Sequence, residues 1–309
     1  MHQIALVGTG YWGTNIATSF EATGRAEIRW LCDLDPKNLA AIAARRPDAR
    51  TTANLDHVLN DDEVEAVVIS TPTTTHHEVT TRAMAAGKHV LVEKPITASS
   101  EDAVDIIKRA KEVNCLVMVG HVFEYSSTII AVKEMIAAGE LGKIHYLHFE
   151  RTNLGPVRTD VNALWDLASH DVSIMCDFLG AAPVDVSANG KAFLNPGVED
   201  VVFATFSFAD GAKAHVHASW LNPRKVRQIT VVGSHKMLVW DDLDLHAPIR
   251  VFDKRADAGA PVNVAGGFLG HKMHLFDAGI FIPKIPMNRP LQAQCEHFLD
   301  CLGNGATPR

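Results

Sequence analysis

Residues 89–96 (HVLVEKPI) begin with the apolar pattern of a buried β-strand, and a lysine, Lys94, stands where that pattern ends. Pro95 has no backbone donor, so the hydrogen-bonded part of the strand must end there. The ammonium group of Lys94 then needs water or a partner. A local ion pair with Glu93 would satisfy it. A ligand would too, because doubly wound folds bind ligands at the carboxyl ends of their parallel strands. The sequence leaves both interpretations open.

A second candidate is the pair Asp166 and His170, which are four residues apart. The pattern of residues 163–179 predicts one helix, on which these two side chains share a face, one turn apart. A carboxylate placed there can tune an imidazole, and the ordinary pKa of imidazole suits general-base catalysis near neutrality. A solvated polar stripe would show the same spacing, so this alternative also stays open.

The segment of residues 7–13 (VGTGYWG) matches the glycine pattern G-x-G-x-x-G of dinucleotide-binding loops. It follows a predicted strand and opens a predicted helix, which is the context that makes the pattern informative. The first glycine permits a tight turn, the second lets a pyrophosphate approach the helix N-terminus, and the third allows the helix to pack closely on the strand. The predicted cofactor contacts here are Gly8, Thr9, Gly10, Tyr11, Trp12 and Gly13.

The second predicted strand ends in a carboxylate, Asp33, which lies 25 residues after Gly8. A carboxylate in this position can accept hydrogen bonds from both ribose hydroxyls and would repel a 2′-phosphate. No arginine follows it, and Lys37 is the nearest cation. The sequence therefore predicts NAD rather than NADP as the cofactor.

Residues 70–76 (STPTTTH) follow another apolar strand. Small hydroxyl-bearing side chains and a proline at the carboxyl end of a strand suit a loop that lies along the cofactor, although many strand–helix turns have a similar composition. From this loop and from the end of the next strand, the further predicted cofactor contacts are Ser70, Thr71, Pro72, Thr75, His76, Glu93 and Lys94.

These side chains must be positioned by alternating strands and helices, which fill residues 1–120. Helices between strands imply right-handed crossovers and a parallel, doubly wound Rossmann sheet, that is, an α/β domain. The predicted strands are residues 3–7, 27–32, 64–70, 89–92 and 115–119, and the predicted helices are residues 11–22, 36–44, 77–86 and 101–112.

The pattern changes in residues 121–309, for which we predict an α+β domain with an open, mostly antiparallel sheet. Two β-hairpins are indicated, one by residues 201–208 with 212–220 and one by residues 226–232 with 236–240. The Ala- and Gly-rich residues 257–270 predict a surface loop, and residues 292–302 predict a terminal helix.

The composition excludes several classes of protein. A net charge of −7 offers no footprint for nucleic acid or an anionic membrane, and no apolar run approaches bilayer length. A strand predicted from residue 3 onward leaves no room for a signal peptide, and five widely spaced cysteines indicate reduced thiols, so we expect a cytoplasmic protein. His215 and His217 could share a strand face, and His271 and His274 a helical face, but no HExxH motif or Cys/His cluster is present, so no metal is predicted.

The glycine loop, residues 70–76, the tripeptide Glu93-Lys94-Pro95 and the Asp166-x-x-x-His170 pair occur in an order and spacing that resemble the glucose–fructose oxidoreductase/inositol dehydrogenase/MocA (Gfo/Idh/MocA) family. The resemblance covers essentially the whole chain. It implies an NAD(P)-dependent sugar dehydrogenase in which Lys94 and His170 are catalytic, with Asp166 beside the histidine. It also implies a cis Lys94–Pro95 peptide, and a homodimer or homotetramer formed through the open sheet.

The substrate prediction depends on residues 150–162, which precede the Asp166–His170 segment. Arginines suit a diphosphate and asparagines suit sugar hydroxyls or an N-acetyl group, although a polar connecting loop would have the same composition. Within the family, residues 151–171 are most similar to members of lipid A and surface-polysaccharide pathways that oxidise the C3 hydroxyl of UDP-N-acetylglucosamine. The predicted substrate-binding residues are Lys94, Tyr125, Arg151, Asn153, Arg158, Asn162, Asp166 and His170.

Other functions remain possible at this point. Tyr125 could line a sugar pocket or pack in the core. The chain could instead be a free-sugar or inositol dehydrogenase, a reductase of 3-keto sugar nucleotides, or a non-catalytic NAD-binding regulator; the presence of Lys94, Asp166 and His170 argues against the last of these.

Overall fold

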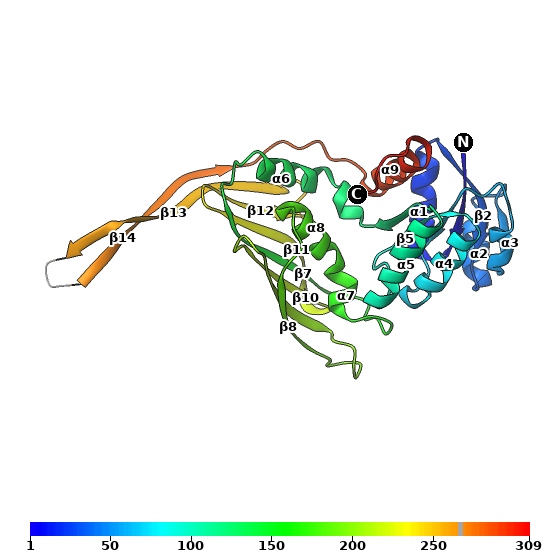
Figure 1. The fold of residues 1–309 in the computed structure, drawn as a ribbon, viewed down its shortest axis with the longest axis horizontal. Coiled ribbons are helices and arrows are strands. Elements are labelled where there is room, and N and C mark those ends of the chain that lie inside the picture. Colours follow the sequence, from blue (N-terminus) through cyan, green and yellow to red (C-terminus); the bar gives the residue numbers. More distant parts are fainter. Residues whose placement is uncertain (265–267) are drawn as a thin grey trace. The chain divides into compact units, whose positions relative to one another are not determined.

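The computed structural model describes residues 1–264 and 268–309 (Figure 1). The chain divides into two units, each with its own sheet. The first unit consists of Met1–Tyr125 with Asn288–Arg309, and the second unit is Ser126–Met287. The predicted boundary after residue 120 lies close to the end of the first segment. Residues 288–309, however, were expected in the second domain and belong to the first.

The first unit contains a six-stranded parallel sheet of order β3-β2-β1-β4-β5-β6, which confirms the predicted Rossmann fold. Its strands are β1 (His2–Val7), β2 (Ala26–Cys32), β3 (Arg50–Thr52), β4 (Ala66–Ile69), β5 (His89–Glu93) and β6 (Val117–Gly120). Its helices are α1 (Tyr11–Ala22), α2 (Pro36–Ala43), α3 (Leu55–Leu59), η1 (Thr73–Thr75), α4 (His76–Ala85), α5 (Ser100–Glu112), η2 (Val122–Tyr125) and α9 (Pro290–Asn304). The short β3 and α3 were not predicted.

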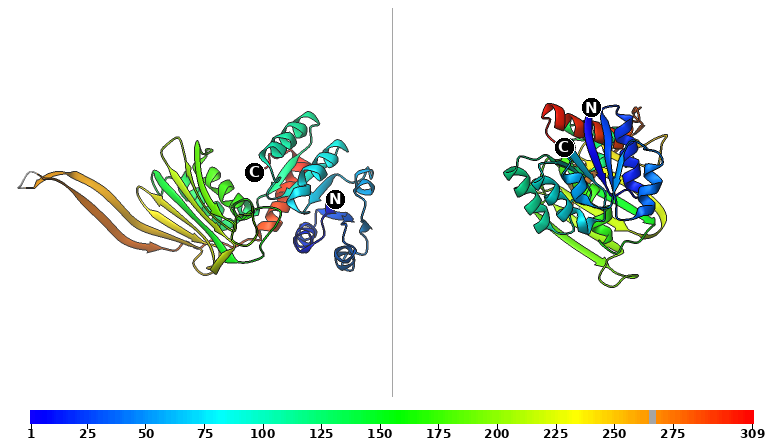
Figure 2. Two further views of the ribbon diagram at one scale, coloured as in Figure 1. Left: turned by 90° about the horizontal axis from the view of Figure 1, so that it is seen from below. Right: turned by 90° about the vertical axis from the view of Figure 1, so that its right-hand side faces the viewer.

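Helices cover both faces of this sheet (Figures 1 and 2). Successive residues of β1 point to opposite faces: Ile4 and Leu6 pack in one apolar cluster with α1, α2 and α9, while Ala5 and Val7 pack in another with α3, α4 and α5. Burial on both faces explains why the strands are continuous apolar runs rather than alternating ones. It also leaves the carboxyl edge of the sheet as the place where polar side chains can gather.

Helix α9 joins the first unit because its apolar face completes the first of these clusters. Phe298 contacts Phe20 of α1 edge to face, with ring centroids 6.2 Å apart, and Cys295 and Leu299 are buried beside it. Asn288 donates a hydrogen bond of 2.7 Å to the carbonyl oxygen of Tyr125. An amphipathic helix buries its apolar face wherever a matching surface exists, and the sequence position of α9 did not indicate which sheet would offer one.

The second unit contains an eight-stranded sheet of order β14-β13-β12-β11-β7-β10-β9-β8, antiparallel except for the pairing of β7 with β10. This confirms the predicted open, mostly antiparallel sheet. Its strands are β7 (Ile144–Leu154), β8 (Asp185–Lys191), β9 (Val201–Ser207), β10 (Lys213–Ser219), β11 (Leu221–Gly233), β12 (Met237–Asp241), β13 (Ile249–Val264) and β14 (Phe268–Phe281). Its helices are α6 (Ser127–Ala137), α7 (Ala163–Leu167) and α8 (Ser169–Leu179).

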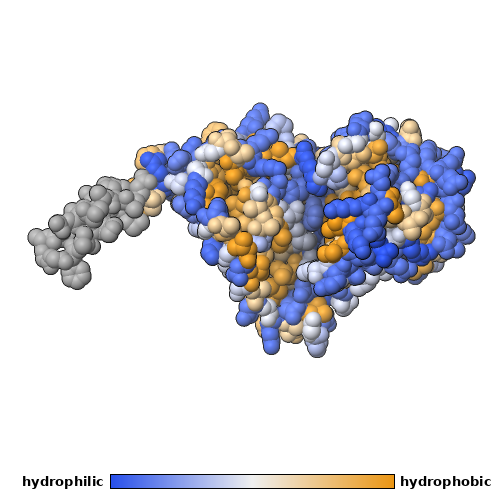
Figure 3. Space-filling model, viewed as in Figure 1, coloured by the Kyte–Doolittle hydropathy of each residue, from blue (hydrophilic) through white to orange (hydrophobic). Residues whose placement is uncertain are grey.

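One face of this sheet carries the helices. Along β7, Leu147, Phe149 and Arg151 are buried, whereas the intervening His148 and Glu150 face the other way and are partly exposed. The indole of Trp240 in β12 donates a hydrogen bond of 2.8 Å to Thr128 of α6 on the helical side. In the view of Figure 3, hydrophobic residues reach the surface over much of the second unit.

Two sequence predictions for this unit are wrong. Residues 163–179 are not one helix, because α7 ends at Leu167 and α8 begins at Ser169, with Ala168 capping both. Residues 257–264 and 268–270 are not a loop but parts of β13 and β14, a two-stranded ribbon that extends beyond the other strands (Figure 1). His271 and His274 accordingly lie on a strand and not on a helix. Backbone pairing sets this ribbon, and the Ala- and Gly-rich composition carries little β-propensity to reveal it.

No helix within the described residues has both the length and the hydropathy needed to cross a membrane. The same residues contain no cluster of three or more His, Cys, Asp or Glu side chains arranged to hold a metal ion.

Candidate cofactor and catalytic sites

The glycine loop between β1 and α1 has the geometry that a pyrophosphate requires. Gly8 has φ +92°, and a Cβ there would lie 2.6 Å from the backbone of Ser70. A Cβ on Gly13 would lie 2.1 Å from the carbonyl oxygen of Gly8, so the helix could not approach the strand. Gly10, at the N-cap of α1, has open space where its Cβ would be. The loop therefore offers a phosphate both room and a helix N-terminus.

Asp33 follows β2 and is held against this loop by its neighbours. The backbone N–H and the hydroxyl of Thr9 donate to Oδ2 of Asp33 at 2.6 and 2.9 Å, and the N–H of Asp35 donates to Oδ1 at 2.8 Å. Partial burial alone would raise the pKa of Asp33, but the hydrogen bonds from Asp35 and Thr9 hold it below its ordinary value. Asp33 is therefore an oriented anion at the position expected for a ribose ligand.

The segment after β4 is tied to the same loop. The hydroxyl of Ser70 donates to the carbonyl oxygen of Gly8 at 2.6 Å, and the hydroxyl of Thr75 donates to Thr71 at 2.7 Å. The ring nitrogens of the buried His76 lie 2.9 Å from the carbonyl oxygens of Thr71 and Pro95. Ser70 and His76 thus bind backbone atoms and shape this edge of the sheet.

Lys94 follows β5 at the carboxyl edge, and the Lys94–Pro95 peptide is cis, as the family resemblance implied. Burial and the nearby ammonium group of Lys94 together lower the pKa of His121 to about 4. Glu93 is only 7% exposed, and its carboxylate accepts hydrogen bonds from the side chain of Trp12 and from the backbone N–H of Lys94, the latter at 3.2 Å. The link between Trp12 and Glu93 was not predicted, because nothing in the spacing of these residues indicates it.

In the second unit, Asp166 and His170 lie on different helices, α7 and α8, so the one-helix geometry predicted for this pair is wrong. Asp166 accepts hydrogen bonds from Nη1 of Arg158 at 3.1 Å and from Nε1 of Trp220 at 3.3 Å. Arg158 also donates to both carboxylate oxygens of Asp160, at 2.8 and 2.5 Å. The guanidinium of Arg158, predicted to bind a diphosphate, is therefore shared between two carboxylates.

His170 is buried in the first turn of α8, next to the buried Asp171. Arg151 of β7 binds Asp171 through Nε at 3.1 Å and Nη2 at 2.6 Å. Arg151 is only 5% exposed, so it has little surface for the predicted substrate contact. The pair instead fastens α8, and with it His170, to the sheet. The role of Asp171 was not predicted, although a buried arginine needs an acidic partner.

The remaining predicted substrate residues have different surroundings. The side chain of Asn162 caps α7 by accepting from the N–H of Trp165 at 3.0 Å, and it donates to Glu199 at 2.9 Å. Asn153 is partly exposed near the end of β7. Tyr125 is 3% exposed and packs in the apolar cluster of the first unit, where burial raises the pKa of its hydroxyl. The prediction that Tyr125 lines a sugar pocket is therefore not supported.

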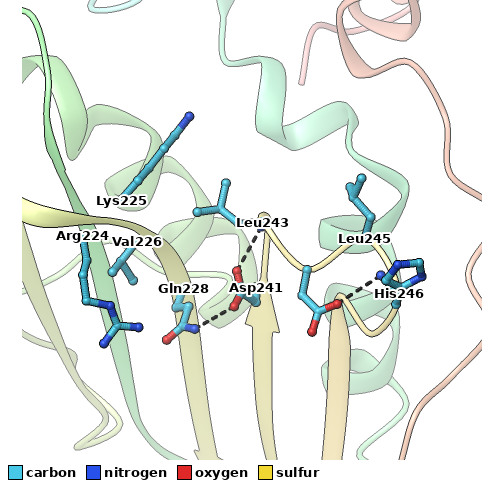
Figure 4. A pocket seen from close by; sticks show the side chains of 9 residues that line it. Arg224, Lys225, Val226, Gln228, Asp241, Leu243, Leu245 and His246 are labelled. Atoms are coloured by element: carbon cyan, nitrogen blue, oxygen red, sulfur yellow. Dashed lines mark hydrogen bonds between the residues drawn. The ribbon is translucent and has the colours of Figure 1, made fainter.

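A hollow of ≈ 400 Å³ lies elsewhere in the second unit, between β11 and the turn after β12 (Figure 4). Arg224 and Lys225 lie on one side of it, and Gln228 donates to Asp241 on another at 2.7 Å. None of the predicted site residues lines this hollow.

The Rossmann sheet, the glycine loop and the oriented Asp33 define a dinucleotide-binding domain. Residues 2–121 match the model of the oxidoreductase family with an NAD-binding Rossmann fold, and residues 129–239 match the model of the GFO/IDH/MocA C-terminal domain. The chain belongs to the Gfo/Idh/MocA family, as the sequence motifs indicated.

Characterised relatives have different substrates. UDP-N-acetylglucosamine 3-dehydrogenase of Acidithiobacillus ferrooxidans is 31% identical over 73% of this chain and 69% of its own length. The NAD⁺-dependent scyllo-inositol 2-dehydrogenase of Bacillus subtilis is 28% identical over 99% of this chain and 88% of its own. Some other relatives are longer, and the match spans 60% of their length.

Among solved structures, GenD2 from gentamicin A biosynthesis, in complex with NAD, superimposes with a TM-score of 0.80 at 26% identity, over 98% of this chain and 87% of its own. The match of residues 2–121 to a family with an NAD-binding Rossmann fold makes NAD the cofactor of this chain, and the glycine loop and Asp33 described above fit it.

Proposed function

We propose that this protein oxidises the C3 hydroxyl of a nucleotide sugar, UDP-N-acetylglucosamine, to the 3-keto sugar, with NAD⁺ as the hydride acceptor. The observation that carries the proposal is Lys94, a partly buried ammonium group that directly follows β5 at the carboxyl edge of an NAD-binding sheet. The substrate follows from the 31% identical relative that acts on UDP-N-acetylglucosamine.

In the proposed reaction, His170 accepts the proton of the sugar hydroxyl. Lys94 donates a hydrogen bond to the same oxygen as negative charge develops on it, an interaction that is strongest in the transition state. When bound, NAD⁺ would be the acceptor of the hydride from C3 of the sugar. Asp166 is proposed to orient the reacting groups, since Arg158 and Trp220 hold its carboxylate in place.

The test is to incubate the protein with NAD⁺ and separate candidate substrates while recording NADH absorbance. UDP-N-acetylglucosamine, UDP-glucose, free N-acetylglucosamine and scyllo-inositol form the smallest useful panel. NADH formation with UDP-N-acetylglucosamine alone, together with a ketone at C3 of the product, is the expected result. NAD⁺ binding without NADH formation from any member would indicate a non-catalytic regulator, or a reductase that must be assayed with NADH and the 3-keto sugar nucleotide.

A second candidate is oxidation of a free sugar or inositol. It is favoured because both arginines already form ion pairs with carboxylates: Arg151 with Asp171, and Arg158 with Asp160 and Asp166. A diphosphate would have to compete with these carboxylates. Turnover of scyllo-inositol or N-acetylglucosamine with none of the UDP-sugars would establish this candidate.

We also propose that the protein is a cytoplasmic homodimer or homotetramer formed through the exposed face of its second sheet. On that face, His148 stacks on His215 with centroids 5.4 Å apart, and the 46% exposed Phe203 stacks on His217 at 4.5 Å. A second copy of the sheet would cover these rings. Light scattering of the wild type and of Phe203→Glu would test this, since a purely monomeric wild type contradicts it.

The cytoplasmic location is supported by the cysteines, which are thiols and not disulfides, as expected in a reducing compartment.

A further inference from the structure

Glu93 is a buried carboxylic acid at the carboxyl edge of the NAD-binding sheet. Its side chain reaches from the end of β5 to Trp12 in the first turn of α1, whose side chain donates a hydrogen bond to it. It also lies against Gly120 at the end of β6, where a Cβ would come within 2.7 Å of its Oε1. The carboxyl group therefore lies over the ends of the strands, next to the glycine loop, and not in the apolar layers of the sheet.

The groups that face Glu93 leave it little compensating charge. The ammonium group of Lys94, directly after β5, and the thiol of Cys295 in α9 interact with Glu93, and the imidazole of His121, beyond β6, lies near Lys94. Burial keeps both of the latter neutral, since it raises the pKa of Cys295 and lowers that of His121 to about 4. Burial also raises the pKa of Glu93 to about 7, against the opposing effects of Trp12 and Lys94.

The position of Glu93 along the sheet indicates which part of the cofactor it meets. A dinucleotide lies across the carboxyl ends of the strands, with its pyrophosphate at the N-terminus of the first helix. Asp33, after β2, is on the adenosine side of β1. Strands β4 and β5 are on the other side, so the end of β5 belongs to the nicotinamide half. The oxidised nicotinamide ring carries a positive charge, and the reduced ring carries none.

We propose that Glu93 distinguishes the oxidised from the reduced cofactor: the fraction of its carboxyl group that is protonated in the free protein releases its proton to solvent when NAD⁺ binds, so that a carboxylate faces the cationic ring. This inference rests on the proposed cofactor site. The O–H bond of the acid breaks, the proton goes to water, and no electrons are transferred. Binding of NADH leaves the protonated fraction unchanged, because a neutral ring offers nothing to offset burial of the charge.

The test is isothermal titration calorimetry of NAD⁺ and NADH binding, at pH 7, in buffers of different ionisation enthalpy. With a group half-protonated in the free protein, about half a proton is released per NAD⁺ bound, and none per NADH. Between pH 6 and pH 8 the affinity for NAD⁺ rises roughly tenfold, and that for NADH does not rise. The readout is proton release and affinity, and it needs no sugar substrate.

The matched variants are Glu93→Gln and His121→Asn. The glutamine keeps the size of the side chain and an oxygen acceptor for Trp12 but cannot ionise, so proton release and the pH dependence of NAD⁺ affinity should both disappear while NADH affinity is retained. His121→Asn removes the neighbouring titratable ring and should leave proton release at the wild-type value. Proton release that persists when NAD⁺ binds to Glu93→Gln overturns the proposal. So does proton release from the wild type that is as large with NADH as with NAD⁺.

If Glu93→Gln does not fold, as judged by its thermal melt, Trp12→Phe takes its place. This variant removes a donor that favours the ionised acid, so the midpoint of the pH dependence of NAD⁺ affinity should move upward; an unmoved midpoint overturns the proposal. Failure of the wild type to bind either cofactor form would overturn the cofactor site as well. Proton release by a protein that oxidises no sugar would contradict the proposed function alone.

Discussion

The two units hold their polar residues in place in different ways. At the cofactor site of the first unit the contacts are made largely to backbone atoms at the ends of neighbouring strands: Asp33 accepts from the backbone of Thr9 and Asp35, and Ser70 donates to the carbonyl of Gly8. In the second unit side chains from separate elements bind one another, as Arg151 of β7 does with Asp171 of α8. Backbone contacts tolerate changes of side chain, whereas a buried ion pair depends on both members.

This difference has an energetic consequence. A buried charge whose partner is removed bears the full penalty of burial, whereas a surface residue that loses one backbone contact can turn to water. We therefore expect substitutions in the buried ion pair of the second unit to affect folding, and substitutions at the cofactor site of the first unit to affect cofactor binding or chemistry more than folding. The following experiments would break or sharpen that comparison.

The largest effect is expected for Asp171→Ala. Arg151 would keep a buried charge without the carboxylate that Asp171 provides, and breaking a buried ion pair in this way destabilises by about 3–5 kcal/mol. Chemical denaturation of wild type and variant measures the difference in the free energy of unfolding. The double variant Arg151→Met with Asp171→Leu is the control, since it removes both charges and should recover most of the loss. A double variant as unstable as Asp171→Ala would show that the ion pair is not the cause.

Lys94→Met should lower kcat by about 10²–10³-fold, because it removes the donor to the developing alkoxide. NAD⁺ should still bind, and thermal stability should change little, since Lys94 is only partly buried. Steady-state kinetics and calorimetric titration of NAD⁺ separate the two effects. Retention of near wild-type turnover would contradict the proposed role, and a large loss of stability would contradict the contrast between the units.

Asp33→Asn should cost about 1 kcal/mol of stability at pH 7, because the hydrogen bonds from Thr9 and Asp35 favour the ionised acid. The pKa of Asp33 is lowered in the folded state, so its stabilisation is present above the unfolded pKa of about 3.9 and is lost as the pH falls through the folded value. Denaturation curves of both proteins should therefore converge at acid pH. The variant should also accept NADP⁺ better, and an unchanged preference for NAD⁺ would argue against Asp33 as a ribose ligand.

Trp220→Phe should have the smallest effect, about 1 kcal/mol of stability, since it removes one hydrogen bond to Asp166 and keeps an aromatic side chain. If Asp166 orients the catalytic groups, kcat should fall while KM stays the same. Kinetics at several pH values provide the measurement. Unchanged kcat with reduced stability would show that the role of Trp220 is purely structural.

Much of the first unit could be predicted from the sequence because its signals are local. The positive φ of Gly8, the turn that it permits and the carboxylate after β2 follow from residues near one another in the chain. The second unit was predicted only in outline. The break at Ala168 and the partners of Asp166 depend on packing against β9, β10 and the segment after β7, which residue spacing cannot reveal.

The sequence by itself determined the fold class, the NAD-binding loop and the family, because these depend on short-range backbone geometry and on motifs a few residues long. Only the tertiary structure decided that α9 completes the first unit, that Arg151 is bound by Asp171, and that Glu93 is buried beside Trp12. The reason is physical: the partner of a buried polar group is chosen by which elements meet in space, and any of several carboxylates in the chain would have looked equally suitable.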